Sequence, residues 1–331
     1  MTLAVLTAGL AACDDGRRPL PEDDAAVAPT WWKPVVGQVK NWDIQLSAKA
    51  GDIDVSMPRV MYDLDLWSLV PTTMMLDYGD GTPVMVPPGA LAGVIAQLHA
   101  RTPSTMVICH VETGLWEASR PDAAKFPGAG ADPTQIPDNP DMPAMGSVVG
   151  WSLGSADHRL LDTSAASRKL WEPILLKRFD LAQRIGCDGI EPAHADAGIY
   201  TSGFTVPTED IYSWYGEIAM QGHTRVLSTG MKNGDLVASA IDMGASIFDW
   251  LMIERCGENM SCDVVKPFLA LDKPVLAIEY STDDGANMDP PRDPMPQSAA
   301  GVCDQQNMAG IPDGIYKDVQ LTGAVRTQCV P

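Results

Sequence analysis

The chain has 331 residues, of which 45% are hydrophobic and 20% are charged, and this composition is typical of a folded globular protein. A single (β/α)8 barrel takes about 250 residues, so one elaborated domain fits this length better than two. The 43 acidic and 23 basic side chains give a net charge of −20, which disfavours nucleic acid and anionic membrane surfaces as partners and favours cationic or neutral ligands. The same charge can also serve solubility alone.

The first residues predict an export signal. An apolar stretch of small residues ends in Leu10-Ala11-Ala12-Cys13 and is followed by a charged, Pro-rich tract. The Leu-x-x-Cys pattern is similar to a bacterial lipobox, in which cleavage before the cysteine leaves it to be lipidated; a plain secretory signal is the alternative. We therefore expect a lipoprotein-type signal over 1–13, a tether over 14–38 and a folded domain over 39–331. The expected location is the cell envelope, with secretion as the alternative.

The chain then alternates between strand and helix patterns, and from residue 160 onward the alternation is regular. The expected strands are 42–46, 59–63, 105–111, 148–151, 187–191, 226–229, 246–253 and 274–280. The expected helices are 90–101, 164–185, 208–221, 235–243 and 263–271. Eight strands separated by helices, without a Gly-x-Gly-x-x-Gly turn, favour a (β/α)8 TIM barrel of the α/β class over an open doubly wound sheet. Its long βα loops, at 66–88 and 113–147, are expected to wall a cleft.

The cysteines predict disulfides. Removal of Cys13 leaves six cysteines, an even number that permits up to three bridges and fits an oxidising compartment. Two pairs are close in sequence, one around a short loop and one in a Pro- and Gly-rich C-terminal tail, and are the expected disulfides: Cys256 with Cys262 and Cys303 with Cys329. Cys109 and Cys187 are expected to be buried strand residues.

Polar residues follow six of the expected strands. In a (β/α)8 barrel the reacting groups stand at the C-terminal strand ends. The residues there are Asp63, Asp65, His110, Glu112, Glu117, Glu191, His194, Asp196, Lys232, Asn233, Asp249, Glu254, Glu279 and Tyr280. Each acid alone is explained well enough as a solvated loop charge or a helix cap, but such a gathering is typical of a catalytic site. Trp67 and Trp116, beside these acids, are expected to stack on sugar rings.

Several segments, in this order, carry a family resemblance. They include Tyr62-Asp63-Leu64-Asp65, Arg120-Pro121-Asp122, Cys187-Asp188-Gly189-Ile190-Glu191-Pro192, Phe248-Asp249-Trp250, Glu254-Arg255-Cys256 and Ile278-Glu279-Tyr280. From about Trp42 to Cys329 the chain resembles the endo-α-1,4-polygalactosaminidase family, glycoside hydrolase family 114. The resemblance implies an extracellular TIM barrel that cuts within α-linked galactosamine-containing polysaccharides, using two acidic residues and neither a metal nor an organic cofactor.

The resemblance and the strand-end positions together predict the site. Cleavage needs one carboxylic acid to protonate the leaving oxygen and one carboxylate to act as nucleophile or to activate water. We expect Glu254 to be the proton donor and Asp196 or Glu191 to be its partner. The residues expected to bind substrate are Asp63, Asp65, Trp67, Glu112, His194, Lys232, Asn233, Asp249, Glu279 and Tyr280. The expected partner is a cationic or neutral exopolysaccharide, which an acidic cleft would attract.

One position departs from the family pattern and leaves alternatives open. The family motif usually reads Glu-Pro-Asp-Asn-x-Asp, whereas residues 191–196 read Glu-Pro-Ala-His-Ala-Asp. With Ala193 in place of an acid, the alternative is a lipid-anchored polysaccharide-binding barrel with reduced or lost catalysis. A metal-dependent hydrolase using His110, His158 and His194 is a further alternative, although no His-x-His or His-Glu-x-x-His pairing appears.

Overall fold

The computed structural model describes residues 30–128, 146–280 and 299–329. The predicted signal segment, the lipidation site Cys13 and most of the predicted tether lie outside the described residues. One compact unit extends from Trp31 to Pro331, so its first residues fall within the range expected to be tether. None of the described helices is long and apolar enough to cross a membrane.

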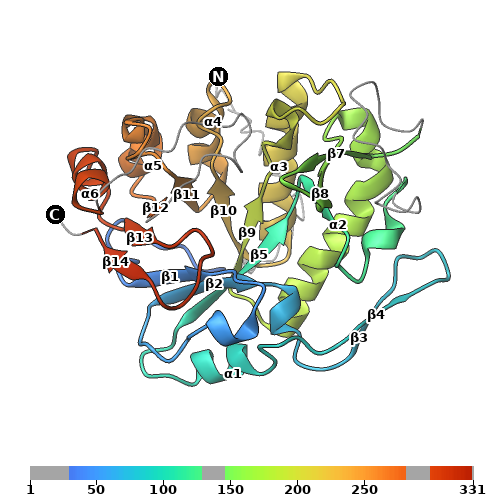
Figure 1. Cartoon of the computed structure of the whole chain (residues 1–331), viewed down its shortest axis with the longest axis horizontal. Helices are drawn as coiled ribbons and strands as arrows, with labels where there is room; N and C mark the ends of the chain where they lie inside the picture. Colours follow the sequence, from blue (N-terminus) through green and yellow to red (C-terminus); the bar gives the residue numbers. More distant parts are fainter. Residues whose placement is uncertain (1–29, 129–145, 281–298, 330–331) are drawn as a thin grey trace, which may run out of the picture. The chain divides into compact units, whose positions relative to one another are not determined.

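A curved sheet of nine strands forms the centre of this unit (Figure 1). Its strands, in spatial order, are β1 (Trp42–Gln45), β2 (Met61–Asp65), β5 (Met106–Glu112), β9 (Gly189–Ala193), β10 (Ser228–Lys232), β11 (Trp250–Glu254), β12 (Val275–Tyr280), β13 (Ile315–Lys317) and β14 (Arg326–Gln328). All neighbours are parallel except β13 and β14. The two edges are joined through side chains, because Lys317 pairs with Asp43 at 2.8 Å and Arg326 donates to the carbonyl of Trp42 at 2.7 Å. The sheet is therefore a nearly closed barrel, which confirms the expected fold class.

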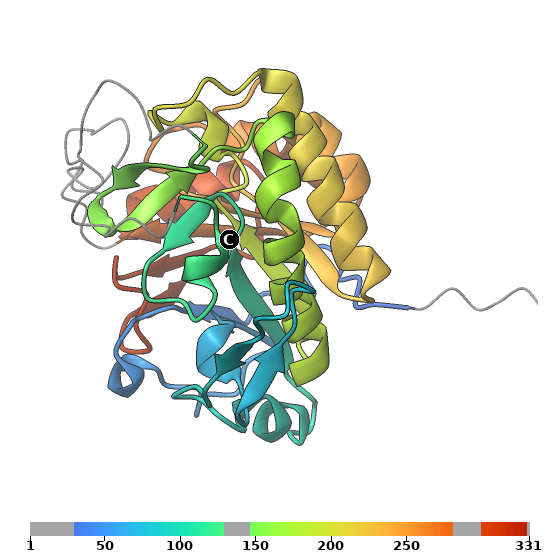
Figure 2. The ribbon, with the colours of Figure 1, turned by 90° about the vertical axis from the view of Figure 1, so that its right-hand side faces the viewer.

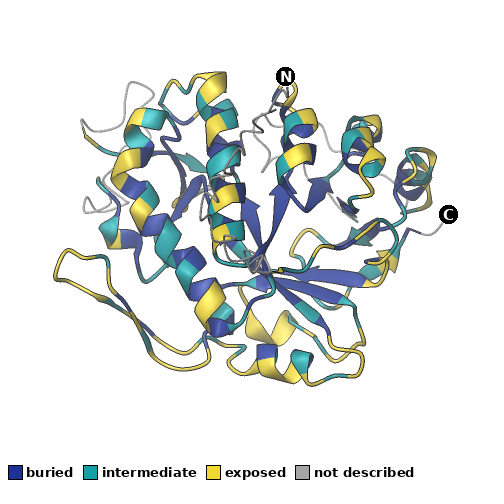
Figure 3. Ribbon diagram, turned by 180° about the vertical axis from the view of Figure 1, so that it is seen from behind, coloured by how far each residue is buried: buried dark blue, intermediate teal, exposed yellow. Residues whose placement is uncertain are grey.

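Six helices accompany the strands in the described ranges. They are α1 (Val94–His99), α2 (Ala165–Ile185), α3 (Thr208–Thr224), α4 (Ala240–Ile247), α5 (Lys266–Ala270) and α6 (Ala299–Met308). Figure 2 shows α2 and α3 side by side against the sheet, and Figure 3 shows their exposed residues on the face away from it. Helix α2 buries Trp171, Leu175 and Phe179 and ends at Gly186, whose φ of 93° favours glycine. The predicted span of this helix is confirmed.

The alternation of side chains along each strand positions the site. On β11, Leu251 and Ile253 pack in the hydrophobic cluster shared with the helices, whereas Trp250 and Met252 belong to a second cluster, inside the barrel. Because successive side chains point to opposite faces, Glu254 follows Met252 on the inner face, at the mouth of the barrel. The same alternation directs His110 and Glu112, which follow Ile108 on β5, to the inner face.

The eighth parallel strand differs from the one expected. The segment near 148–151 forms β7 (Val149–Leu153), which pairs with β8 (Ser155–Leu161) in a separate sheet with β6 (Leu115–Glu117). The chain reverses direction at Gly154, so the backbone of β7 forms its hydrogen bonds with the antiparallel strand β8. This segment therefore does not enter the barrel. The barrel instead takes β13 from the C-terminal tail. The predicted loop 66–88 holds a second hairpin, β3 (Met74–Leu76) with β4 (Val84–Val86).

Three disulfides are present among the described residues. The expected pairs Cys256–Cys262 and Cys303–Cys329 are confirmed. Cys109 and Cys187 are buried, as expected, and they also form a third bridge that was not among the expected pairs, with a Cα–Cα distance of 6.0 Å. Cys109 lies on β5 and Cys187 lies between α2 and β9, and these two strands are neighbours in the sheet. Their apolar surroundings predicted burial correctly but concealed the pairing.

These bridges provide a test of stability. The bridge from Cys109 to Cys187 spans 78 residues and the bridge from Cys256 to Cys262 spans 6. A longer closed loop restricts the unfolded chain more, so replacing the first pair with alanine is expected to lower the free energy of unfolding by about 4 kcal/mol, and replacing the second pair by about 2 kcal/mol. Guanidinium unfolding of the two double variants measures the difference. A larger loss from the short loop would contradict this expectation.

Candidate active site

A cleft of about 790 Å³ opens at the C-terminal ends of the parallel strands. Side chains from β2, β5, β9, β10, β11 and β12, and from the loops that follow them, line it. The polar ones are Asp65, His110, Glu112, Glu117, Arg120, His158, His194, Asp196, Tyr200, Lys232, Asn233, Asp235, Glu254, Arg255, Asn259 and Tyr280. Strand ends from most of the barrel therefore converge on one cleft, as the fold predicts.

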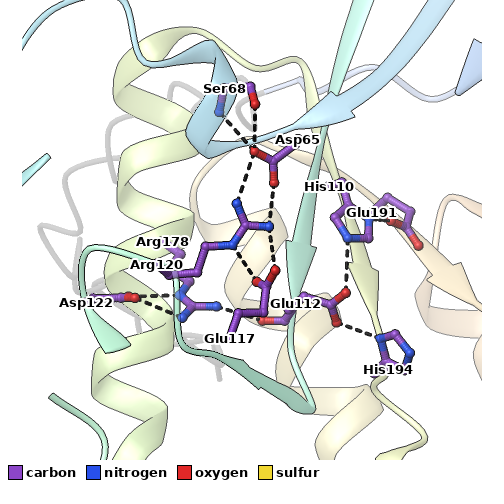
Figure 4. A network of polar contacts seen from close by, with 10 residues as sticks. All are labelled: Asp65, Ser68, His110, Glu112, Glu117, Arg120, Asp122, Arg178, Glu191 and His194. Carbon is purple, nitrogen blue, oxygen red and sulfur yellow. Dashed lines mark hydrogen bonds and ion pairs between the residues drawn. The ribbon is translucent and has the colours of Figure 1, made fainter. Parts of the chain in front are cut away.

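Acidic and basic groups alternate in a row along the floor of this cleft, and the row includes Glu191, which is fully buried and does not itself line the cleft. Glu112 contacts Nε2 of His110 at 3.2 Å, and Nδ1 of the same ring is hydrogen-bonded to Glu191 (Figure 4). Lys232 lies 3.3 Å from Glu191 and 3.5 Å from Glu254. Four adjacent strands, β5, β9, β10 and β11, supply this row. Each buried charge has an opposite charge beside it, which offsets the cost of removing it from water.

Glu254 is held in its ionised form. Burial acts to raise its pKa, but the ammonium group of Lys232 and hydrogen bonds from Tyr280 and Asn233 lower the pKa to about 2. Asn233 holds the residue twice, since its Nδ2 donates to Oε2 at 3.1 Å and its Oδ1 accepts the backbone N–H of Glu254 at 3.0 Å. The side chain keeps 24% of its exposure, so a carboxylate remains open to the cleft.

Asp196 has the opposite environment. Its carboxyl lines the cleft but is only 3% exposed, and burial raises its pKa to about 6. The charges of Asp235 and Glu254 raise the pKa further, against the lowering effect of His194. The cleft therefore contains one carboxyl that retains its proton at mildly acidic pH and one that does not.

A second network shapes one wall. Arg120 binds Asp65 at 2.8 Å and Glu117 at 2.6 Å, and Asp65 also accepts hydrogen bonds from the backbone and hydroxyl of Ser68 (Figure 4). The loop that carries Arg120 is joined to α2, because Asp122 forms two contacts of 2.9 Å with the buried Arg178. Arg120 was not among the expected site residues, although its Arg-Pro-Asp segment belongs to the family pattern.

Some of the residues expected to catalyse the reaction or to bind substrate lie below or beside the cleft. Asp63 and Glu191 have no exposed surface, and neither lines it. Glu191 is therefore placed to position His110 and Lys232 rather than to touch a substrate. Trp67 is half-buried under the guanidinium of Arg178, 5.5 Å from its ring centroid. Trp116 is 2% exposed, so the expectation that it stacks on sugar is wrong.

Two further expectations are corrected by the direction of the strands. Asp249 precedes β11 and so lies at the opposite end of the barrel, where it accepts hydrogen bonds from Trp31 and from the backbone of Thr229. Glu279 does not line the cleft; its carboxylate accepts the backbone N–H groups of Gly257 and Glu258 and thereby orders the loop after β11. The hydrogen bonds that these two carboxylates accept give each of them a structural role outside the cleft.

Two clusters of possible metal ligands occur among the described residues. One contains Cys256 and Cys262, whose sulfurs are joined in a disulfide and cannot act as thiolate ligands. In the other, both ring nitrogens of His110 already contact carboxylates, and the ammonium group of Lys232 occupies the space beside Glu191. The ion pairs account for His110 and Glu191, whereas the third member, Asp63, has no hydrogen-bond partner among the described residues, and burial together with the charge of Glu191 raises its pKa well above the usual range.

Comparison with known proteins identifies the family. The model of the glycoside-hydrolase family GH114 matches residues 21–330. The chain belongs to this family. It is therefore a glycosidase, and the cleft that contains Asp196 and Glu254 lies where an enzyme with this barrel carries out its chemistry.

Solved structures agree on the fold. The chain resembles a crystal structure of Ega3 from Aspergillus fumigatus in complex with galactosamine, with 23% identity and a TM-score of 0.64 over 91% of this chain and 98% of that one. It also resembles a variant of the glycoside hydrolase domain of PelA from Pseudomonas aeruginosa, with 10% identity and a TM-score of 0.50 over 87% and 98% of the two chains. Among curated proteins no significant match is found.

Proposed function

We propose that this glycosidase cleaves within α-linked galactosamine-containing polysaccharide and that Asp196 and Glu254 are its catalytic residues. The observation that carries the proposal is the contrast between these two carboxyl groups in one cleft, with pKa values of about 6 and about 2. Membership of family GH114 and the similarity to a protein crystallised with galactosamine support the choice of substrate. Two carboxyl groups of different pKa are what glycosidic cleavage requires.

The charges favour a particular division of roles. Asp196, whose burial keeps a proton on it, is suited to protonate the leaving oxygen. Glu254, ionised beside Lys232, is suited to act as the nucleophile or to activate water. This is the reverse of the sequence-based expectation, in which Glu254 is the donor. The ionic contacts of Lys232, which cannot be inferred from spacing along the chain, are the reason for the change.

Ala193 does not remove the means of catalysis. It lies at the end of β9 and lines the cleft, but Asp196 and Glu254 line the same cleft without it. A barrel that only binds polysaccharide is therefore not favoured, since the family is one of hydrolases and a pair of acids of opposite protonation is present.

The pH profile follows from the two pKa values. Asp196 loses its proton as the pH rises through about 6, and Glu254 remains ionised above about 2. We expect kcat/KM to be highest below pH 6 and then to fall about tenfold per pH unit as the donor is lost. Initial rates on one soluble substrate, measured across this range, provide the profile. A rate that rises through pH 6 would contradict the assignment of Asp196 as the donor.

We propose further that the protein is exported and that Cys13 is lipidated. Three disulfides support an oxidising compartment, and the Leu-x-x-Cys pattern supports the anchor. Metabolic labelling with a fatty-acid analogue tests this, because the label should disappear in Cys13→Ala. Equal labelling of the variant, or none of either protein, would count against the anchor.

The substrate is tested with defined polymers. Purified protein is incubated with polymers of galactosamine, N-acetylgalactosamine and galactose from about pH 4 to 8, and chain length is followed by size-exclusion chromatography. An endo-acting enzyme should shorten a galactosamine-containing chain rapidly before monosaccharide accumulates. Unchanged length of both amino-sugar polymers at every pH would overturn the proposal, and cleavage of the galactose polymer alone would reassign the sugar.

A further inference from the structure

The end of the barrel opposite the cleft, which we call the base, carries several basic side chains. Lys40, Arg59 and Lys273 each lie two residues before a parallel strand, namely β1, β2 and β12. The N-terminal ends of the parallel strands meet at the base, whereas the active site occupies their C-terminal ends. The fold therefore gathers cations at one end of a chain whose net charge is −20.

The acids that precede parallel strands at the base are used inside the fold. Asp188, Asp249 and Asp313 each accept a backbone N–H, at 2.7, 3.0 and 3.2 Å. Asp188 and Asp249 also contact histidine rings, at 2.8 and 2.9 Å. Lys33 and Lys40, by contrast, are exposed. These carboxyl groups thus serve the fold, whereas the two lysines present their charge to solvent.

Residues 31–41 run across the base. At one end of this segment, Trp31 stacks on His223 in the last turn of α3, with ring centroids 4.3 Å apart. At the other end, Asn41 accepts a hydrogen bond from Arg59 at 2.5 Å. Figure 2 shows the start of the segment, drawn in blue, beside the end of α3. The compact unit, which starts at Trp31, therefore begins at its base.

A groove of about 620 Å³ lies at the same end, between residues 31–35 and the ends of α3 and α5. Its lining includes Lys33, Lys273 and the exposed Asp272. The large apolar side chains exposed along it are Val35, Met220 and Leu271, at 39%, 51% and 55%. Apolar side chains flanked by lysines suit the boundary between the headgroups and the acyl chains of a bilayer.

The two lysines of this groove repel each other. Burial lowers the pKa of Lys273, and the charge of Lys33 lowers it too, against the raising effect of Asp249. Lys273 donates to the carbonyls of Ala245 and Phe248, at 2.7 and 2.5 Å, so neutral groups hold its ammonium in place. An anionic group above the groove would offset this repulsion.

We propose that the base is a docking surface for the headgroups of an anionic phospholipid bilayer, the membrane that holds Cys13, and that docking keeps the cleft on the side away from this membrane. The inference rests on the proposed lipid anchor and not on the proposed reaction. Residues 14–30, which link Cys13 to the base, span no more than about 60 Å when fully extended. The anchor therefore keeps the base within reach of the bilayer, where a weak attraction is enough.

The net charge of −20 does not oppose docking once the protein is anchored. Charges are screened beyond about 8 Å at physiological ionic strength, so the headgroups respond to the side chains of the base rather than to the whole chain. Each lysine or arginine close to an anionic surface strengthens attachment about fivefold. The expectation that anionic membranes are disfavoured partners therefore applies to the free chain.

Hydrogen exchange on vesicles tests the docking. The mature chain is coupled through Cys13 to a maleimide lipid, since the other six cysteines form disulfides. The vesicles contain phosphatidylcholine, alone or with about 30% phosphatidylglycerol. We expect residues 31–41 to exchange about tenfold more slowly on the anionic vesicles, and the loops of the cleft to exchange equally on both. Salt at about 1 M should remove the difference.

Two double variants test the charges. Lys33→Glu with Lys40→Glu should lose the slower exchange, because reversing two charges weakens attachment by about 30-fold or more. Both side chains are exposed, so the fold should be retained. Lys169→Glu with Lys266→Glu changes the net charge equally, at exposed positions near the N-terminal ends of α2 and α5. This control should keep the slower exchange.

The outcomes separate docking from the anchor and from the reaction. Equal exchange of residues 31–41 on the two kinds of vesicle, equal loss in both double variants, or slower exchange at the cleft instead of the base overturns the docking surface. Because maleimide coupling replaces the natural lipid, slower exchange in a protein that cells do not lipidate would reject the anchor and leave the docking surface standing. Inactivity on every polymer would reject the proposed reaction alone.

Discussion

Replacing Glu254 with glutamine is expected to lower kcat/KM on the polymer by about a thousandfold or more. Glutamine keeps the size of the side chain and its hydrogen bond with Asn233, but it removes the negative charge that Lys232 and Tyr280 surround. A neutral amide can neither attack the anomeric carbon nor accept a proton from water. The fold should be retained, because the residue is partly exposed and does not belong to the hydrophobic core.

This loss is measured against a matched variant. Glu258→Gln removes a carboxylate four residues away, which pairs with Arg255 at 3.1 Å and does not line the cleft. Initial rates and thermal melts of both variants separate a catalytic loss from unfolding. Glu254→Gln with more than about a tenth of the activity of wild type would remove Glu254 from the catalytic pair.

The second large effect is expected at Asp196, and it should depend on the leaving group. In Asp196→Asn the amide cannot donate a proton to the glycosidic oxygen, so kcat on the polymer should fall by about 10²-fold to 10⁴-fold. The leaving oxygen of an aryl glycoside with an acidic phenol needs little protonation, so kcat of Asp196→Asn on such a substrate should fall far less. Glu254→Gln should lose activity on both kinds of substrate, because the carboxylate is needed whatever leaves.

The comparison of substrates distinguishes the two possible role assignments. If Glu254→Gln keeps activity on the aryl glycoside while Asp196→Asn loses it, then Glu254 is the donor and Asp196 is the carboxylate. Asp242→Asn serves as the control, because Asp242 is exposed on α4. If Asp196→Asn loses the same share of kcat on both substrates, the role of Asp196 as the proton donor is contradicted.

Local patterns in the sequence predict much of the fold. The apolar stripe that includes Leu175 on α2, with Gly186 at its end, indicates a long helix, and most barrel strands are short apolar runs between helices. The missed strand, Ile315–Lys317, has three residues and no repeated pattern. Its place in the sheet depends on a register with β12 and on the pairing of Lys317 with Asp43, which are distant in sequence.

The sequence predicts that the site lies at the C-terminal ends of the strands. It does not predict which of the side chains there are ionised. A strand that begins a few residues later than expected moves Asp249 from the mouth of the barrel to its base. The protonation of Glu254 depends on Lys232, and that of Asp196 depends on burial and on charges such as that of Glu254, which belongs to a different strand. Cross-strand neighbours are set by sheet order and register, and spacing along one strand carries no information about them.

The most direct measurement is a crystal structure of Glu254→Gln with a bound galactosamine oligomer. We expect one glycosidic oxygen to lie within about 2.6–3.2 Å of the carboxyl of Asp196 and the anomeric carbon of the same bond to face the side chain at position 254. An oligomer whose glycosidic bonds all lie away from both side chains, or whose scissile bond lies between other acids, would contradict it.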